Sequence, residues 1–126
     1  MRNRSLQYLA LIVVVVALLV ATPTAFAQGD QMCEHTATID SLHQCITHAA
    51  AVGHIDNSGV ANSLLKKLDA AQAALNRGQA NVAVNNLQAF IHAVDAQTGK
   101  HIAADHAAHM IMHAEAVIDS LTNEGS

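Results

Sequence analysis

Aromatic residues are almost absent from this chain of 126 residues, which holds two Phe, one Tyr and no Trp. Proteins that bind single-stranded nucleic acid stack the bases on aromatic rings. Basic residues are also scarce, with six Lys and Arg against ten Asp and Glu, so few phosphates could be neutralised. Both shortages argue against nucleic acid as a partner, and the lack of rings argues, less strongly, against sugar stacking.

The first 27 residues have the three parts of a secretory signal peptide. Arg2 and Arg4 make the start positive, residues 9–21 carry no polar side chain, and Ala-Phe-Ala at 25–27 is a small-residue cleavage motif. A spanning helix needs about 20 apolar residues, so we favour cleavage after this motif over an uncleaved anchor. We therefore expect a protein secreted to the periplasm or extracellular space, with no transmembrane anchor after cleavage. Loss of the two arginines lowers its formal charge from −4 to −6.

Apolar residues after the signal peptide recur at helical spacing in four blocks, which predicts four helices. They span about 38–52, 58–77, 79–96 and 103–121. Proline is absent after Pro23 and the glycines of this part fall mainly at the junctions, as expected of a mostly helical chain. Because the connections are short, we expect an all-α fold, a four-helix antiparallel up-and-down bundle.

The part that follows the signal peptide is long enough for one domain. We expect an N-terminal arm over 28–37, a four-helix domain over 38–122 and a C-terminal tail over 123–126. The inward positions are rich in alanine, and small side chains bury little area each. We therefore expect modest stability, to which the larger inward residues contribute most: Leu64, Leu68, Leu87, Phe90 and Ile111.

Cys33 and Cys45 are the only cysteines. In an exported protein an even pair predicts a disulfide. An unbroken helix would separate the two by about 18 Å, whereas a disulfide needs Cα atoms within about 7 Å. Three arrangements remain open: Cys33 on a non-helical arm folded back onto the first helix, a bond between two chains, or two free thiols. We favour the folded-back arm.

Four stretches resemble the FIMAH domain, a helical module of exported bacterial and archaeal proteins. They are GHIDNSGVANSLLKKL (53–68), LNRG (75–78), NNLQAFI (85–91) and AQTGK (96–100). The resemblance extends over about 39–121 and implies a module without a catalytic role, commonly found at the C-terminal end of larger extracellular proteins. Two departures are the cysteine pair and Ala103, where similar chains often place a serine. We expect this chain to be a stand-alone FIMAH-like domain.

Histidine is unusually frequent, with nine residues in the chain. His106, His109 and His113 lie on adjacent turns of one face of the last expected helix. Such spacing lets neighbouring imidazoles share one Cu, Ni or Zn ion, with His101 or Asp105 as a further ligand. This face points away from the apolar stripe, so we expect it at the surface, where nothing orients the rings. We favour incidental surface histidines over a metal site.

The chain shows no motif that joins a nucleophile to a base, so we expect no enzyme. The favoured hypothesis is an exported, non-catalytic interaction module. It would bind another exported protein, a cell-surface component, or a second copy of itself as a homo-oligomer. The alternative is a small periplasmic or extracellular histidine-rich metal-binding protein. Protonation of the nine histidines would also move the formal charge of the mature chain from −6 to +3, so charge-driven contacts would reverse sign in mild acid.

Overall fold

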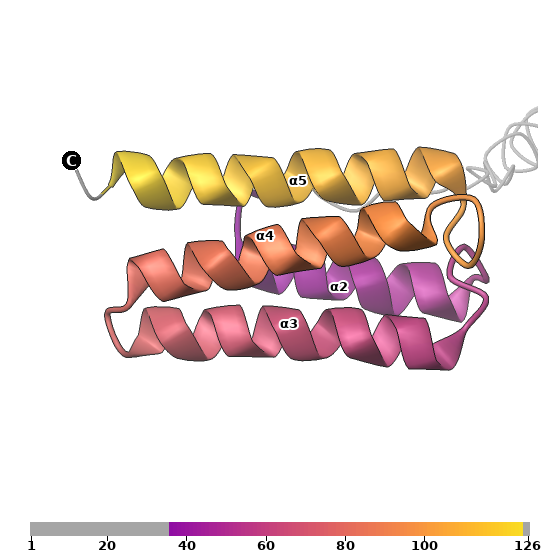
Figure 1. Cartoon of the computed structure of the whole chain (residues 1–126), viewed down its shortest axis with the longest axis horizontal. Helices are drawn as coiled ribbons and strands as arrows, with labels where there is room; N and C mark the ends of the chain where they lie inside the picture. The colour runs from indigo at the N-terminus through magenta and orange to yellow at the C-terminus, as the bar shows by residue number, and fades with distance from the viewer. Residues whose placement is uncertain (1–35, 125–126) are drawn as a thin grey trace, which may run out of the picture. The chain divides into compact units, whose positions relative to one another are not determined.

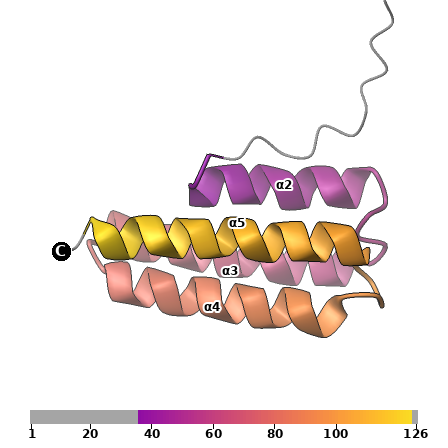
Figure 2. The same cartoon turned by 90° about the horizontal axis from the view of Figure 1, so that it is seen from above.

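The computed structural model describes residues 36–124; the expected signal peptide, most of the expected arm and the last two residues lie outside this range. The described residues form four helices: α2 (Ile39–Ala51), α3 (Ser58–Asn76), α4 (Ala80–Gln97) and α5 (Ala104–Asn123). Each helix runs antiparallel to the one before it (Figures 1 and 2). The prediction of an all-α four-helix fold is therefore confirmed, with α5 ending one residue inside the expected tail.

The ends of the helices follow from local chemistry. The Thr38 hydroxyl oxygen accepts a hydrogen bond from the Ser41 amide at 3.2 Å and caps α2. No side chain caps α5 at Ala103, but Asp105 lies in its first turn, where a carboxylate offsets the positive end of the helix. Gly99, in the α4–α5 loop, has a φ of 70°, which side-chain-bearing residues rarely adopt.

The core lies between the four helices and is built from short aliphatic side chains around Phe90, the largest residue without exposed surface. Leu64, Leu68 and Leu87 are fully buried as predicted. Ile111 is only partly buried and packs against the edge of the core. The fully buried apolar positions of α5 carry smaller or more flexible side chains: Ala107, Met110, Ala114 and Val117.

Two loops meet at one end of the bundle, where α2 connects to α3 and α4 connects to α5 (Figure 1). Ile55 and Ile102 form an isolated antiparallel bridge between them. Both isoleucines are almost fully buried, at 3% and 1% exposure, so the loops close this end of the core. We call residues 53–57 and 98–103 together the paired-loop end. Within residues 36–124, no helix is long and apolar enough to cross a membrane.

Candidate functional site

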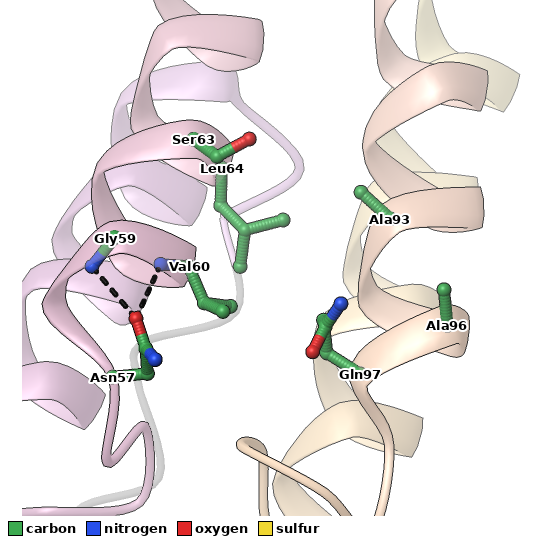
Figure 3. Close-up of a pocket in the computed structure, with 8 residues that line it drawn as sticks. All are labelled: Asn57, Gly59, Val60, Ser63, Leu64, Ala93, Ala96 and Gln97. Carbon is green, nitrogen blue, oxygen red and sulfur yellow. Dashed lines mark hydrogen bonds between the residues drawn. The ribbon is translucent and has the colours of Figure 1, made fainter.

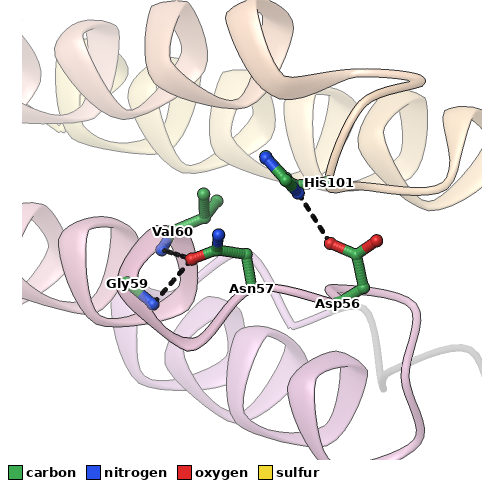
Figure 4. Close-up of polar contacts among 5 residues, drawn as sticks. All are labelled: Asp56, Asn57, Gly59, Val60 and His101. Carbon is green, nitrogen blue, oxygen red and sulfur yellow. Dashed lines mark hydrogen bonds and ion pairs between the residues drawn. The ribbon is translucent and has the colours of Figure 1, made fainter.

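The paired-loop end carries a side-chain contact from one loop to the other. His101 Nδ1 lies 2.8 Å from Asp56 Oδ1 (Figure 4). The side chains are 43% and 64% exposed, so the pair is solvated and contributes little to stability. Next to it, the Asn57 amide oxygen accepts hydrogen bonds from the Gly59 and Val60 amides and caps α3. Asp56 therefore directly precedes a capped helix, and this cap fixes the direction of the loop backbone next to the His101–Asp56 pair.

A second contact at the same end joins the loop after α2 to the first turn of α5. The rings of His54 and His106 are stacked, with centroids 3.5 Å apart and an angle of 20° between their planes. His106 also contacts its neighbour, with Nδ1 at 3.3 Å from Asp105 Oδ1. The same carboxyl oxygen accepts a hydrogen bond from the His106 amide at 3.0 Å. The side-chain and backbone hydrogen bonds from His106 lower the pKa of Asp105 below its ordinary 3.8.

A shallow hollow of about 260 Å³ lies between the two loops. Its lining carries two imidazoles, one ammonium group and one carboxylate, together with backbone of both loops. The lining residues are Gly53, His54, Asp56, Gly99, Lys100, His101, Ile102 and Ala103. The hollow therefore presents one exposed positive group, Lys100, and one carboxylate, Asp56, which faces His101.

A second hollow of about 280 Å³ lies between the start of α3 and the end of α4. Its eight lining residues are uncharged, and Val60, Leu64 and Ala93 make an apolar floor and wall (Figure 3). Gln97 extends toward α3 from the opposite side (Figure 3). The hollow therefore offers apolar contact with neutral hydrogen-bonding groups.

The three predicted metal ligands of α5 do not converge. His106 is stacked on His54 and His109 is half-buried. His113 is only 4% exposed, so the expectation that all three lie at the surface is wrong for this residue. Within residues 36–124, no group of three or more His, Cys, Asp or Glu side chains is placed to hold a metal ion. Metal binding by the α5 histidines, with His101 or Asp105, stays a prediction.

His113 is buried because it faces α2 and the segment before α2. Its Nε2 lies 2.7 Å from the Thr36 carbonyl oxygen, and its Nδ1 lies 3.9 Å from Cys45 Sγ. Cys45 itself is 1% exposed. Cys33 lies outside the described residues, so the disulfide between the two cysteines also stays a prediction.

Sequence reasoning missed the partners of these histidines. Periodicity places residues only relative to their own helix, and both His54 and Asp56 stand in a loop. One clue was in the sequence: the stretches 53–57 and 96–100 both resemble the family, and the structure brings them together at the paired-loop end. The resemblance alone did not show that they touch.

In a comparison with protein families, the family model of the FIMAH domain matches residues 39–119. The match begins with the first residue of α2 and ends in the last turns of α5, so it takes in both loops of the paired-loop end. Neither the comparison with curated proteins nor the one with solved structures gave a match.

Proposed function

The chain belongs to the FIMAH domain family, and we propose that it is an exported, non-catalytic helical module that binds another exported protein or a cell-surface component. The expected signal peptide supports export, because its charged start, apolar middle and small-residue end suit secretion. A partner of such a module lies in the periplasm or outside the cell.

We assign partner binding to the paired-loop end because its two loops are held in fixed positions relative to one another. The buried Ile55–Ile102 bridge holds two loops side by side. Loops fixed on a rigid scaffold are common positions for binding residues. Lys100 then presents a hydrogen-bond donor, and the half-exposed His101, whose Nδ1 faces the Asp56 carboxylate, presents Nε2 as an acceptor while its ring is neutral.

The exposure of this end favours binding over catalysis. General acid–base chemistry relies on groups whose proton affinity is tuned by burial and by neighbours. The His101–Asp56 pair is open to water on both sides. A solvated imidazole–carboxylate pair suits recognition of polar groups on a partner surface.

Site-specific photo-cross-linking in the producing cell tests the assignment. A photoreactive amino acid replaces Lys100, at the paired-loop end, or Arg77, which is equally basic and exposed but follows α3 at the opposite end of the bundle. We expect the first variant to form an adduct with one defined macromolecule, identified by mass spectrometry, and the second to form none. Asp56→Ala combined with His101→Ala should reduce the adduct.

Three results would contradict this proposal. Adducts of equal yield at both positions would indicate non-specific contact, and adducts at position 77 alone would place recognition at the other end. The absence of any adduct at position 100 across growth conditions would remove the paired-loop end as a binding surface.

The second candidate function is binding of Cu, Ni or Zn, which the spacing of His106, His109 and His113 on α5 favours, because side chains three and four residues apart are neighbours on a helix. Calorimetric titration of the exported, tag-free protein with each metal salt tests this candidate. Binding tighter than about 10 μM (about −7 kcal/mol) that is lost in His106→Ala and His109→Ala would support it. Weaker binding, or binding unchanged in both variants, would leave only the first candidate.

A further inference from the structure

Small side chains line the uncharged hollow between the start of α3 and the end of α4. Gly59 on α3 and Ala93 and Ala96 on α4 belong to its walls, and large side chains at these positions would extend into it. Leu64, which is fully buried, lies at its floor (Figure 3). Its volume of about 280 Å³ is just below the about 300–1,000 Å³ of small-molecule sites, so it suits a single residue of a larger ligand.

Asn57 places a hydrogen-bond donor at the rim of this hollow. Its Oδ1 accepts hydrogen bonds from the Gly59 amide at 2.9 Å and from the Val60 amide at 3.1 Å. Two N–H donors require an oxygen, so the other end of the side-chain amide is its NH₂ group, and the cap fixes the direction of that group. Among residues 36–124, this NH₂ group has no acceptor. The fold therefore leaves a fixed donor for a ligand.

Gln97 offers a second amide on the opposite side of the hollow. Its side chain is half-buried and extends toward α3 (Figure 3). Within the part of the chain that the structure describes, this side-chain amide makes no hydrogen bond. A half-buried polar group is partly shielded from water, so a ligand that completes its hydrogen bonds is favoured. The hollow thus has a donor on one side and, on the other, an amide that can either donate or accept.

We propose that this hollow binds an uncharged peptide segment of the partner protein, with a small aliphatic side chain, alanine or valine, against the floor. The peptide carbonyl accepts from the Asn57 NH₂ group, and the peptide N–H donates to the Gln97 amide oxygen. The inference rests on the proposed function in that the bound partner is a protein. Asn57 belongs to one loop of the paired-loop end and Gln97 directly precedes the other, so one partner reaches both surfaces.

The lining disfavours other classes of ligand. A charged group would lose hydration beside eight uncharged residues that offer no countercharge. A purely apolar group would cover both side-chain amides without completing their hydrogen bonds. Aromatic rings, on which the faces of sugars stack, are absent from the lining. A peptide group beside a small aliphatic side chain supplies the acceptor, the donor and the apolar contact together.

NMR titration of the exported, isotope-labelled protein tests the proposal with three blocked amino acids: N-acetyl-valine N-methylamide and its aspartate and lysine counterparts. The valine probe should shift the backbone amide signals of Gly59, Ser63 and Gln97 in a saturable way. We expect a Kd of about 1–10 mM, as is usual for a fragment of this size. The two charged probes should bind at least about fivefold more weakly. Equal affinity for all three probes, or valine-induced shifts confined to other regions, would overturn the proposal.

Two leucine variants of α4 locate the site. Ala93→Leu places a larger side chain in the hollow and should abolish the saturable shifts. Ala89→Leu is the matched control, because Ala89 is exposed on the same helix and does not line the hollow, and it should leave the Kd unchanged. Binding that survives in Ala93→Leu, or that is lost equally in Ala89→Leu, would contradict the site.

Gln97→Ala is a second variant, which tests the hydrogen bond even if Ala93→Leu does not fold. It removes one hydrogen-bonding group and should weaken binding of the valine probe by about fivefold. Circular dichroism checks that each variant is folded. An unchanged Kd in folded Gln97→Ala would show that its amide does not contact the ligand and would overturn the proposal.

Failure of this proposal is distinguishable from failure of the proposed function. A valine probe that does not bind, while position 100 still cross-links, would eliminate the peptide site and leave the proposed function standing. Binding of the valine probe without any adduct at position 100 would support the hollow and remove the paired-loop end. N-acetylglucosamine shares the acetamide group, so saturable shifts with this sugar but not with the valine probe would assign the hollow to a saccharide and overturn the proposal.

Discussion

The imidazole rings of His54 and His106 are stacked 3.5 Å apart, although one residue belongs to the loop after α2 and the other to the first turn of α5. The stack therefore joins two elements that are not adjacent in the chain. Together with the Ile55–Ile102 bridge it closes the paired-loop end. Loss of either ring should loosen the end of the bundle at which we place recognition.

A double-mutant cycle at pH 8, where histidine is ordinarily neutral, measures this stack. His54→Ala and His106→Ala should each lower the free energy of unfolding in urea. Their combined effect should fall short of the sum by about 0.5–1.5 kcal/mol, the range for stacked ring pairs. The exposed His92→Ala is the control and should change stability by less than about 0.5 kcal/mol. Additive effects would mean that the rings touch without stabilising one another.

Asp105 has a pKa below its ordinary 3.8, mainly because of the hydrogen bond between its side chain and that of His106. We expect His106→Ala to raise this pKa toward the ordinary value, as measured by NMR titration of the carboxyl carbon from about pH 6 to pH 2. His92→Ala should leave it unchanged. An unaltered pKa in the His106 variant would assign the shift to the start of α5 instead.

Because folding lowers the pKa of Asp105, the stability of the folded state should depend on pH in a defined direction. A carboxyl whose pKa is lowered by folding stabilises the folded state above its ordinary pKa. This contribution is lost as the pH falls through the lowered value. Asp105→Asn should therefore flatten the acid limb of the unfolding profile below about pH 4. A variant with the same slope as wild type would contradict the linkage.

Truncation of Phe90 should lower the free energy of unfolding more than truncation of any other core residue. This residue is fully buried in a core that contains many alanines, whose short side chains cannot fill a cavity of this size. Phe90→Ala should lower the free energy of unfolding by about 3–5 kcal/mol, a large part of the about 5–15 kcal/mol of a typical domain. Met112→Ala, at 56% exposure, should change it by less than about 0.5 kcal/mol. Urea denaturation of both variants tests the difference.

The fold could be predicted from the sequence because helical periodicity is a local property. The spacing around Leu64, Leu68 and Leu87 identified the inward faces, and the glycines marked the junctions. Boundaries agreed within a few residues, since the helical repeat of apolar residues is interrupted at each junction. Ile111 shows the limit: periodicity places both Met110 and Ile111 on the inward side of α5, and only the packing of the bundle decides that Met110 is buried and Ile111 partly exposed.

The candidate site could be predicted only in part, because its contacts join distant segments. A helical wheel places His113 at the edge of the buried stripe, next to Met110 and Val117, but cannot show that its ring contacts the Thr36 carbonyl oxygen. Nor can periodicity indicate that His54 stacks on His106, since a loop has no period. The sequence does show which ionisable and reactive side chains the chain contains: many histidines, few lysines and arginines, and a single cysteine pair.

The charge of the exported chain should control its binding to anionic surfaces. Protonation of all nine histidines would move the formal charge of residues 28–126 from −6 to +3. Histidine is the side chain that ordinarily gains charge in mild acid. At the paired-loop end, His54 and His101 would add charge next to Lys100, so attraction to an anion should grow most where we place recognition.

A chromatography resin that carries sulfonate groups is a suitable probe, because the charge of sulfonate does not change between pH 7 and pH 5. Retention of the exported protein should rise steeply between pH 7 and pH 5 and vanish at about 1 M salt, where screening reaches within about 3 Å. Replacing His54 and His101 with Gln should weaken the rise more than replacing His48 and His92, which are exposed elsewhere on the bundle. An equally weakened rise in retention in the two double variants would indicate that only the net charge of the protein matters. Retention that does not change between pH 7 and pH 5 would contradict the pH dependence.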